Sequence, residues 1–346
     1  MKAVKHIASL SRDKQERARA MIRNILAMSH LAPKHFNELI RRIRKQGRVA
    51  LHFHPDRLDK RGLTVIQGLL SDGEYRSQFE TQISNGLLSP VLGGPRDHWE
   101  NGLFADAYHG VEGRPKYGAL DLNLHPNGPA PRFGSCYLLT SPEVQQRATF
   151  TYLDSYRNPP EKGTLEFFDD VLAALMSESF ERHYALGICD CPPSTLVAHL
   201  LTQLSQSPQA RFAQTASKNL DHYIEAQVHG RVSLQHDVDY LVADPCFQQT
   251  DVHAAMQALC DEYEVVLLWQ PELSLAVSDV PDNFRGPLMP TIAKQVAPQG
   301  TLDARQIGEA VKQVNVNFHL WQAYGTRAEV IQQLKLLWHV LVRYGH

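Results

Sequence analysis

The stretch from Arg114 to Tyr156 limits the fold more than any other part of the chain. It contains several short runs of β-forming residues, and clusters of Gly, Pro and Asn separate one run from the next. Such runs predict strands joined by turns, so the chain is not all-helical. Segments with helical periodicity lie on both sides of this stretch. The sequence therefore predicts an α+β chain with one core and helical ends.

Helical periodicity dominates both ends of the chain. Residues 13–48 predict two helices, because apolar residues recur on one face of the first and Pro33 and Gly47 mark the start and end of the second. Further helices are expected over 165–183 and 193–206, and a helix, an apolar strand and a helix pair follow residue 251. We expect three parts: an N-terminal helical segment over 1–48, a core over 49–250, and a C-terminal α/β to helical extension over 251–346.

Composition excludes several classes of partner. The 346 residues carry a formal net charge of −2, and no apolar run approaches the roughly 18 residues of a membrane span. We therefore expect neither a nucleic acid nor a membrane as partner. The N-terminus lacks the apolar region of a signal peptide, and five cysteines are few and odd in number. Both features suit a cytoplasmic protein, and the first also suits secretion by a specialised, non-Sec route.

The motif HFHPDR places two imidazoles on one face of an expected strand. His52 and His54 are two residues apart, so both side chains project from the same side. Together with Asp56 they could bind a metal, as in a metal-dependent phosphoesterase or other hydrolase. The alternative is that one His lines a polar pocket and the other bonds to backbone. Other His residues exist, but none has a recognisable ligand spacing.

The motif YRSQFETQISNG concentrates hydrogen-bonding groups around Phe79. Its polar members are Tyr75, Arg76, Ser77, Glu80, Thr81, Ser84 and Asn85. They could form a wall that grips a nucleotide, with Arg for phosphate, hydroxyls for ribose and an aromatic for a ring. A surface helix with a turn is the alternative. Two aromatic–Gly pairs, Tyr117–Gly118 and Phe133–Gly134, could serve either sheet packing or close approach of a ligand.

The motif YIEAQVHG carries one acid, Glu225, on an expected strand, two residues before Gln227. Taken alone, Glu225 is typical of a charge on the exposed face of a strand.

Several of these motifs, taken in order, resemble those of one family. KYGALDL, FGSCYLLTSPEVQQRATFTYLDS and YIEAQVHGRVSLQHDVDYLV, with HFHPDR and YRSQFETQISNG upstream, resemble a bacterial and fungal family catalogued as a domain of unknown function. Its members look like mono-ADP-ribosyltransferases. The resemblance covers about Val49 to Asp244.

The resemblance implies a fold and a substrate. ADP-ribosyltransferases form a small split β-sandwich that holds NAD, their substrate, in the cleft between two sheets, and no metal is expected. Their first core strand supplies a His or Arg that grips NAD, for which His52, His54 and Arg57 are the candidates here. The second element would be the 75–86 stretch, the YGALDL strand with Tyr117 and Gly118, or the FGSCYL strand.

The resemblance also implies a catalytic acid. Glu225 matches the family's late-strand Glu in chain order, but arginine-directed enzymes carry Glu-x-Glu, and here Gln227 stands second. Either Glu225 is the acid and Gln227 assists it, or Glu80 is the acid. The implied activity is transfer of ADP-ribose to a protein side chain, arginine favoured, with release of nicotinamide, often by a toxin or effector. The alternatives are the metal-dependent hydrolase on His52 and His54, and a non-catalytic binding module on a degenerate transferase fold.

Overall fold

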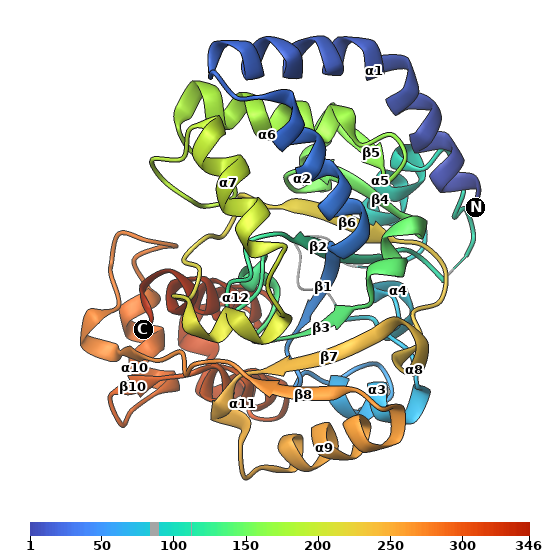
Figure 1. Ribbon diagram of the computed structural model, residues 1–346. Coiled ribbons are helices and arrows are strands. Elements are labelled where there is room, and N and C mark those ends of the chain that lie inside the picture. Colours follow the sequence, from blue (N-terminus) through green and yellow to red (C-terminus); the bar gives the residue numbers. More distant parts are fainter. Residues whose placement is uncertain (84–89, 112) are drawn as a thin grey trace.

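The computed structural model describes residues 1–83, 90–111 and 113–346, and its centre is a mixed sheet (Figure 1). Within these residues the sheet has eight strands in the order β5-β4-β6-β2-β1-β3-β7-β8. The strands are β1 (Arg48–Phe53), β2 (Lys116–Asp121), β3 (Cys136–Thr140), β4 (Ala148–Tyr152), β5 (Lys162–Thr164), β6 (Ile224–Val228), β7 (Val238–Ala243) and β8 (Val266–Trp269). Only the β7–β8 pair is parallel among these neighbours. The predicted α+β class is confirmed.

Helices cover the sheet in three groups (Figure 1). One group contains α1 (Lys2–Met28), α2 (Pro33–Gln46), α6 (Asp169–Arg182) and α7 (Pro193–Gln203); a second contains α3 (Val65–Asp72) and α9 (Asp251–Tyr263); a third contains α10 (Met289–Val296), α11 (Ala304–Val316) and α12 (Arg327–Tyr344). Short helices α4 (Gln78–Thr81), α5 (Pro95–Leu103) and α8 (Leu234–Asp237) lie in the connections. The helices predicted at both ends are therefore present, although α1 begins well before residue 13. A two-stranded ribbon, β9 (Leu275–Ala276) with β10 (Thr301–Leu302), accompanies the third group.

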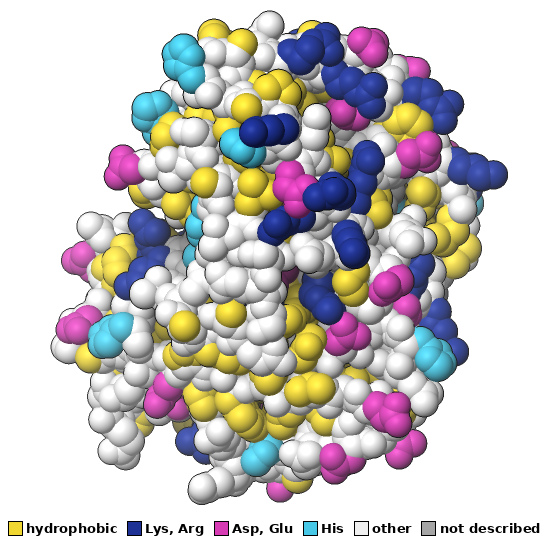
Figure 2. Space-filling model, viewed as in Figure 1, with side chains coloured by type: hydrophobic (Ala, Val, Ile, Leu, Met, Phe, Trp, Pro, Cys, Tyr) yellow, Lys and Arg dark blue, Asp and Glu magenta, His cyan; other side chains and the backbone are white. Residues whose placement is uncertain are grey.

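The N-terminal helices pack on the core through the periodic apolar residues that predicted them. Ile22, Ile25 and Leu26 of α1 are buried in the main hydrophobic core, and removing such side chains from water is the main stabilising term. The outer face of α2 is basic, and Figure 2 shows Lys and Arg side chains gathered over it. No helix in the described ranges is long and apolar enough to cross a membrane.

The sheet opens between β1 and β2. The two strands pair from Arg48 to Ala50, opposite Asp121 to Ala119, and β1 then pairs with β3 from Ala50 to Phe53. Gly118 sits at the branching point, where a Cβ would lie 2.5 Å from the carbonyl oxygen of Ala50. Only glycine allows this approach. The backbone of β2 therefore lies close to β1 at Gly118, and the two strands are no longer paired beyond Ala50.

Candidate functional site

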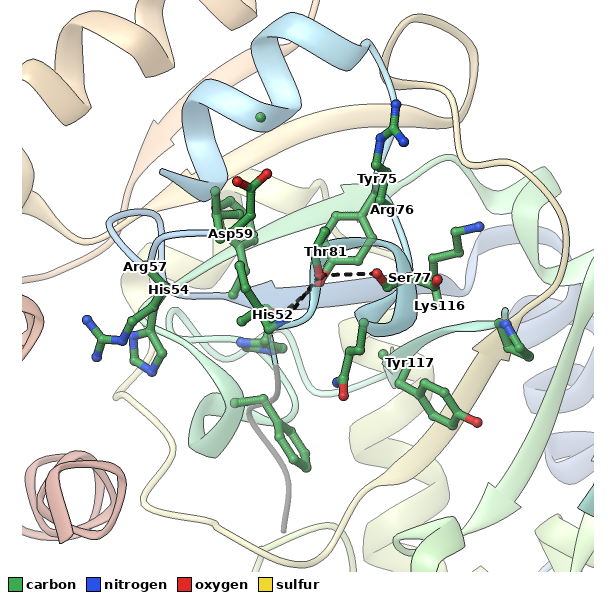
Figure 3. Close-up of a pocket in the computed structure, with 18 of the residues that line it drawn as sticks. His52, His54, Arg57, Asp59, Tyr75, Arg76, Ser77, Thr81, Lys116 and Tyr117 are labelled. Atoms are coloured by element: carbon green, nitrogen blue, oxygen red, sulfur yellow. Dashed lines mark hydrogen bonds between the residues drawn. The ribbon is translucent and has the colours of Figure 1, made fainter. Parts of the chain in front are cut away.

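A cleft occupies the opening between β1 and β2. Its walls come from the end of β1, the 54–61 loop, α3, the 74–81 segment, the start of β2, and the short 3-10 helices η1 (Pro131–Phe133) and η3 (Ser155–Arg157). Figure 3 shows Arg57 and His54 at one end of the labelled group, Lys116 and Tyr117 at the other, and His52 and Tyr75 between them. Glu225 of β6 lines the same cleft.

Glu225 is a buried acid among several carboxyl residues that line this cleft. It is only 5% exposed and pairs with Ala119 of β2 on one side and Thr151 of β4 on the other. The backbone N–H of Ser155 donates to Oε2 at 3.3 Å, the Ser155 hydroxyl donates to Oε1, and Gln227 Nε2 donates to Oε1 at 2.9 Å. Burial, reinforced by the negative charge of Asp154, raises the pKa of Glu225 to about 7 although these donors oppose the shift. Glu225 is therefore a buried carboxyl that titrates near neutrality, not a surface charge.

The raised pKa makes stability depend on pH. The folded protein retains the Glu225 proton up to about pH 7, whereas the unfolded chain loses it near the ordinary 4.5. Between these values the folded state binds more protons, so the free energy of unfolding falls as pH rises. We expect wild type to lose roughly 1–3 kcal/mol more than Glu225→Gln between pH 4.5 and 8. Urea unfolding of both proteins across this range measures the difference, and parallel curves would contradict it.

The two other predicted catalytic residues lie in different surroundings. Gln227 is buried, and its amide nitrogen donates to Glu225. Glu80 does not line the cleft; its carboxylate accepts from the N–H of Ser77 at 2.8 Å in the capping box of α4. Lys116 Nζ lies 4.0 Å from the same carboxylate. The Ser-x-x-Glu spacing in the sequence is itself a capping-box signature, and this local role accounts for Glu80.

His52 lies on the floor of the cleft as a neutral imidazole. Its Nε2 accepts from the N–H of Ala130 at 3.3 Å, and Nδ1 lies 3.4 Å from the carbonyl oxygen of Gly134. Burial lowers its pKa to about 3. Its ring packs on Tyr137 at 4.9 Å, and a Cβ on Gly128 would lie 2.6 Å from its Cε1. Both ring nitrogens of His52 are therefore paired with backbone groups, which is the alternative that the sequence offered for one of the two histidines.

His54 and Arg57 form the other end of the cleft. The His54 ring meets Trp338 of α12 edge-on at 5.1 Å, and Arg57 pairs with Asp56 at 3.0 Å. The Arg57 guanidinium also lies close to α11, because a Cβ on Gly308 would be 2.8 Å from it. His54 and Arg57 therefore both lie next to C-terminal helices. In the described part of the chain, no three His, Cys, Asp or Glu residues are grouped to hold a metal ion.

The 75–86 stretch divides in two. Tyr75, Arg76, Ser77 and Thr81 line the cleft, and the Tyr75 hydroxyl donates to the carbonyl oxygen of His52 at 3.3 Å. Phe79 is buried beneath the Arg114 guanidinium at 4.4 Å and lies outside the cleft. The predicted residues Ser84 and Asn85 lie outside the described residues.

Tyr117 and Gly118 line the cleft on β2. The Tyr117 ring lies 5.8 Å from Trp99 and 5.0 Å from the Arg96 guanidinium, both on α5. A Cβ on Gly118 would collide with β1, so the close packing of the two strands explains why this residue is glycine.

Sequence reasoning missed several cleft residues. They include Arg96, Trp99, Asp154, Ser155 and Tyr156. Ser155 is the most important, because it donates twice to Glu225 from 70 residues away. Its place at the end of a predicted strand, in the sequence LDSY, was the available signal, but nothing local identifies its partner.

Comparison with known proteins agrees with part of the sequence prediction. A family model described as "Protein of unknown function (DUF3626)" matches residues 48–344, from the first strand to the last helix. The match includes every described wall of the cleft and also α12, beyond the segment that carries the recognised motifs. No curated protein gives a significant match.

Proposed function

Because the chain belongs to the DUF3626 family, whose activity must be inferred from the site itself, we propose that it is a mono-ADP-ribosyltransferase. It would cleave NAD in the β1–β2 cleft and transfer ADP-ribose to a protein side chain. The observation that carries the proposal is Glu225, a buried, hydrogen-bonded carboxyl that titrates near neutrality inside the cleft. Groups with shifted pKa in clefts are functional candidates. The divergence of β1 and β2 supports the split-sheet fold that the motifs imply.

The chemistry requires a carboxylate of this kind. Breaking the nicotinamide–ribose bond develops positive charge on the ribose, as in glycoside cleavage. A carboxylate beside the sugar stabilises that charge more strongly in the transition state than in the ground state, so it raises the rate. Nicotinamide leaves as a neutral molecule and needs no strong general acid. One ionised Glu225 is therefore sufficient, without a second catalytic carboxyl.

The cleft offers groups for each part of NAD. In our proposal the nicotinamide ring lies near Tyr117 and Glu225, in the cleft that His52 and Tyr75 also line. Arg57 and Arg76 line the cleft and are the candidates for binding the diphosphate. This arrangement keeps the bond to be broken beside Glu225.

The acceptor side is open beside η3. Asp154 lines the cleft near Glu225, and Tyr156 is an exposed aromatic next to it. A protein arginine remains the favoured acceptor, because its guanidinium is always charged and a carboxylate such as Asp154 can orient it. Gln227 and Glu80 bond to other groups of the protein and are not cleft-lining, whereas Asp154 lines the cleft and also accepts from the N–H of Tyr156 at 2.9 Å.

Binding and turnover of NAD test the proposal. We expect NAD at 100 times its Kd to stabilise the folded protein by about 2.7 kcal/mol and so to raise its melting temperature. We also expect nicotinamide to be released on incubation with NAD. Isothermal calorimetry and chromatographic detection of nicotinamide measure the two effects, and NAD labelled in the adenylate shows transfer to added proteins. Binding without nicotinamide release would favour a non-catalytic module. Absence of both would refute the proposal.

A further inference from the structure

A row of buried polar side chains extends from Glu225 toward the outer end of β6. Gln227 Nε2 lies 2.9 Å from Glu225, Gln227 Oε1 lies 2.7 Å from the Thr149 hydroxyl, and that hydroxyl lies 2.9 Å from His229 Nε2. The Tyr108 hydroxyl lies 2.6 Å from His229 Nδ1. Gln227, Thr149 and His229 are each at most 1% exposed. The row therefore connects the acid of the cleft to a residue at the edge of the core.

The chemistry of the end group determines the direction of the first bond. An ionised carboxylate only accepts, so the Gln227 atom facing Glu225 is the amide nitrogen. The same nitrogen lies 3.3 Å from the Thr151 hydroxyl, which already donates to the carbonyl oxygen of Leu153 and so must accept. Two independent neighbours thus give the amide one orientation.

The donors and acceptors of the remaining bonds follow from the orientation of the Gln227 amide. With its nitrogen toward Glu225, Gln227 presents an oxygen to Thr149, which donates its hydroxyl proton there. The Thr149 oxygen then accepts from His229 Nε2–H, and His229 Nδ1 accepts from the Tyr108 hydroxyl. Burial lowers the pKa of His229 to about 3, so the ring is neutral with one proton, as this pattern requires. Packing by Phe104 at 5.2 Å and by Tyr108 holds the ring in place.

Satisfaction of buried polar groups accounts for each bond, and the orientation of the Gln227 amide gives all of them one direction. Each donor in the row points toward the carboxylate, and hydrogen bonds in series polarise one another. The row therefore stabilises the ionised form of Glu225 against burial and against the charge of Asp154. A Glu at position 227 would place a second carboxylate against the first and remove the donor.

We propose that Gln227, Thr149 and His229 form a positioning chain that favours the ionised form of the Glu225 carboxyl and orients it toward the cleft. The proposal rests on the proposed NAD cleavage for its catalytic meaning, but the hold on Glu225 can be measured without it. This role requires an amide at position 227, because Gln227 accepts from Thr149 through its oxygen and donates to Glu225 through its nitrogen.

Other charged and titratable groups also face the chain. Asp154, Tyr117 and Tyr223 act on Glu225. Lys116, Arg147 and the amino terminus act on His229. Substitution of Thr149 leaves all of them unchanged, so this residue gives the cleanest test.

Thr149→Val removes the hydroxyl and keeps the β-branched shape, and Thr149→Ser keeps the hydroxyl. In Thr149→Val the Gln227 oxygen loses its donor, so Thr149 and His229 no longer polarise the Gln227 N–H that bonds to Glu225. We expect the acid limb of the pH–kcat profile for nicotinamide release to move up by about one pH unit. The rate then falls roughly fivefold at pH 7 and returns to the wild-type value near pH 9, while KM for NAD stays within about twofold. Thr149→Ser restores the wild-type limb.

A loss of rate that is equal at pH 7 and pH 9 would show a merely structural role and overturn the proposal. A second readout needs no activity. The difference in unfolding free energy between Thr149→Val and Thr149→Val/Glu225→Gln, measured against pH, reports the titration of Glu225 alone. Its midpoint should lie above that of the wild type and Glu225→Gln pair. If NAD is not cleaved but the midpoint moves, the proposed function fails and the positioning chain stands; equal midpoints refute the chain whether or not NAD is cleaved.

Discussion

Replacing Glu225 by Gln is expected to lower nicotinamide release from NAD by about 10²–10³-fold, the usual effect of removing one group that stabilises transition-state charge. Gln keeps the size of the side chain and can still bond to Ser155, but it has no negative charge beside the ribose. The loss should lie in kcat, with little change in the Kd of NAD. Steady-state kinetics and calorimetry on the same preparation separate the two.

Glu80→Gln is the matched control. Gln serves as well as Glu at the third position of a capping box, so the bonds at Ser77 are retained. Because Glu80 lies outside the cleft, we expect this variant to cleave NAD within about twofold of wild type. The opposite pattern, with activity retained in Glu225→Gln and lost in Glu80→Gln, would assign the acid to Glu80. Full activity in both variants would refute carboxylate-assisted cleavage in this protein.

Replacing Arg114 by Met is expected to cause the largest loss of stability, about 3–5 kcal/mol. The Arg114 side chain has no exposed surface, and its guanidinium lies 2.5 Å from Asp97 and 3.3 Å from Glu100 on α5. Without it, the two buried carboxylates have one cation fewer and Phe79 loses the guanidinium above its ring, and leaving a buried charge unpaired costs far more than losing a surface pair. Urea unfolding measures the change.

Arg41→Met provides the comparison. Arg41 also pairs with a carboxylate, that of Glu38, but its side chain is 75% exposed, so we expect a change within about 0.5 kcal/mol. Since α5 carries Arg96 and Trp99 into the cleft, Arg114→Met should also weaken NAD binding. Equal stability of the two variants would contradict the assignment of a buried charge cluster.

Local sequence patterns were sufficient for the elements of the fold. Helical periodicity over 165–183 corresponds to α6 at Asp169–Arg182, and the apolar run before Pro55 corresponds to β1 at Arg48–Phe53. The same holds for the strand that carries Glu225. These patterns are readable because burial of one face repeats every two or about 3.6 residues along the chain. The motif order further identified a family of unknown function, which the family match confirms.

Only the tertiary structure determined which groups surround the Glu225 carboxyl. Whether Glu225 is a surface charge or a buried acid depends on Ser155 and Thr149, which are more than 60 residues away and carry no local sign of their partner. Likewise, the opening of the sheet depends on β2 ending its pairing with β1 at Ala50, while β3 stays paired along the other edge of β1 to Phe53. A residue's own conformation follows from its near neighbours in the chain, whereas its charge state and partners follow from which distant segments pack against it and exclude water. The sequence by itself therefore determined that Glu225 lies on a strand, and packing determined that this carboxyl is buried, oriented and poised near neutral pH.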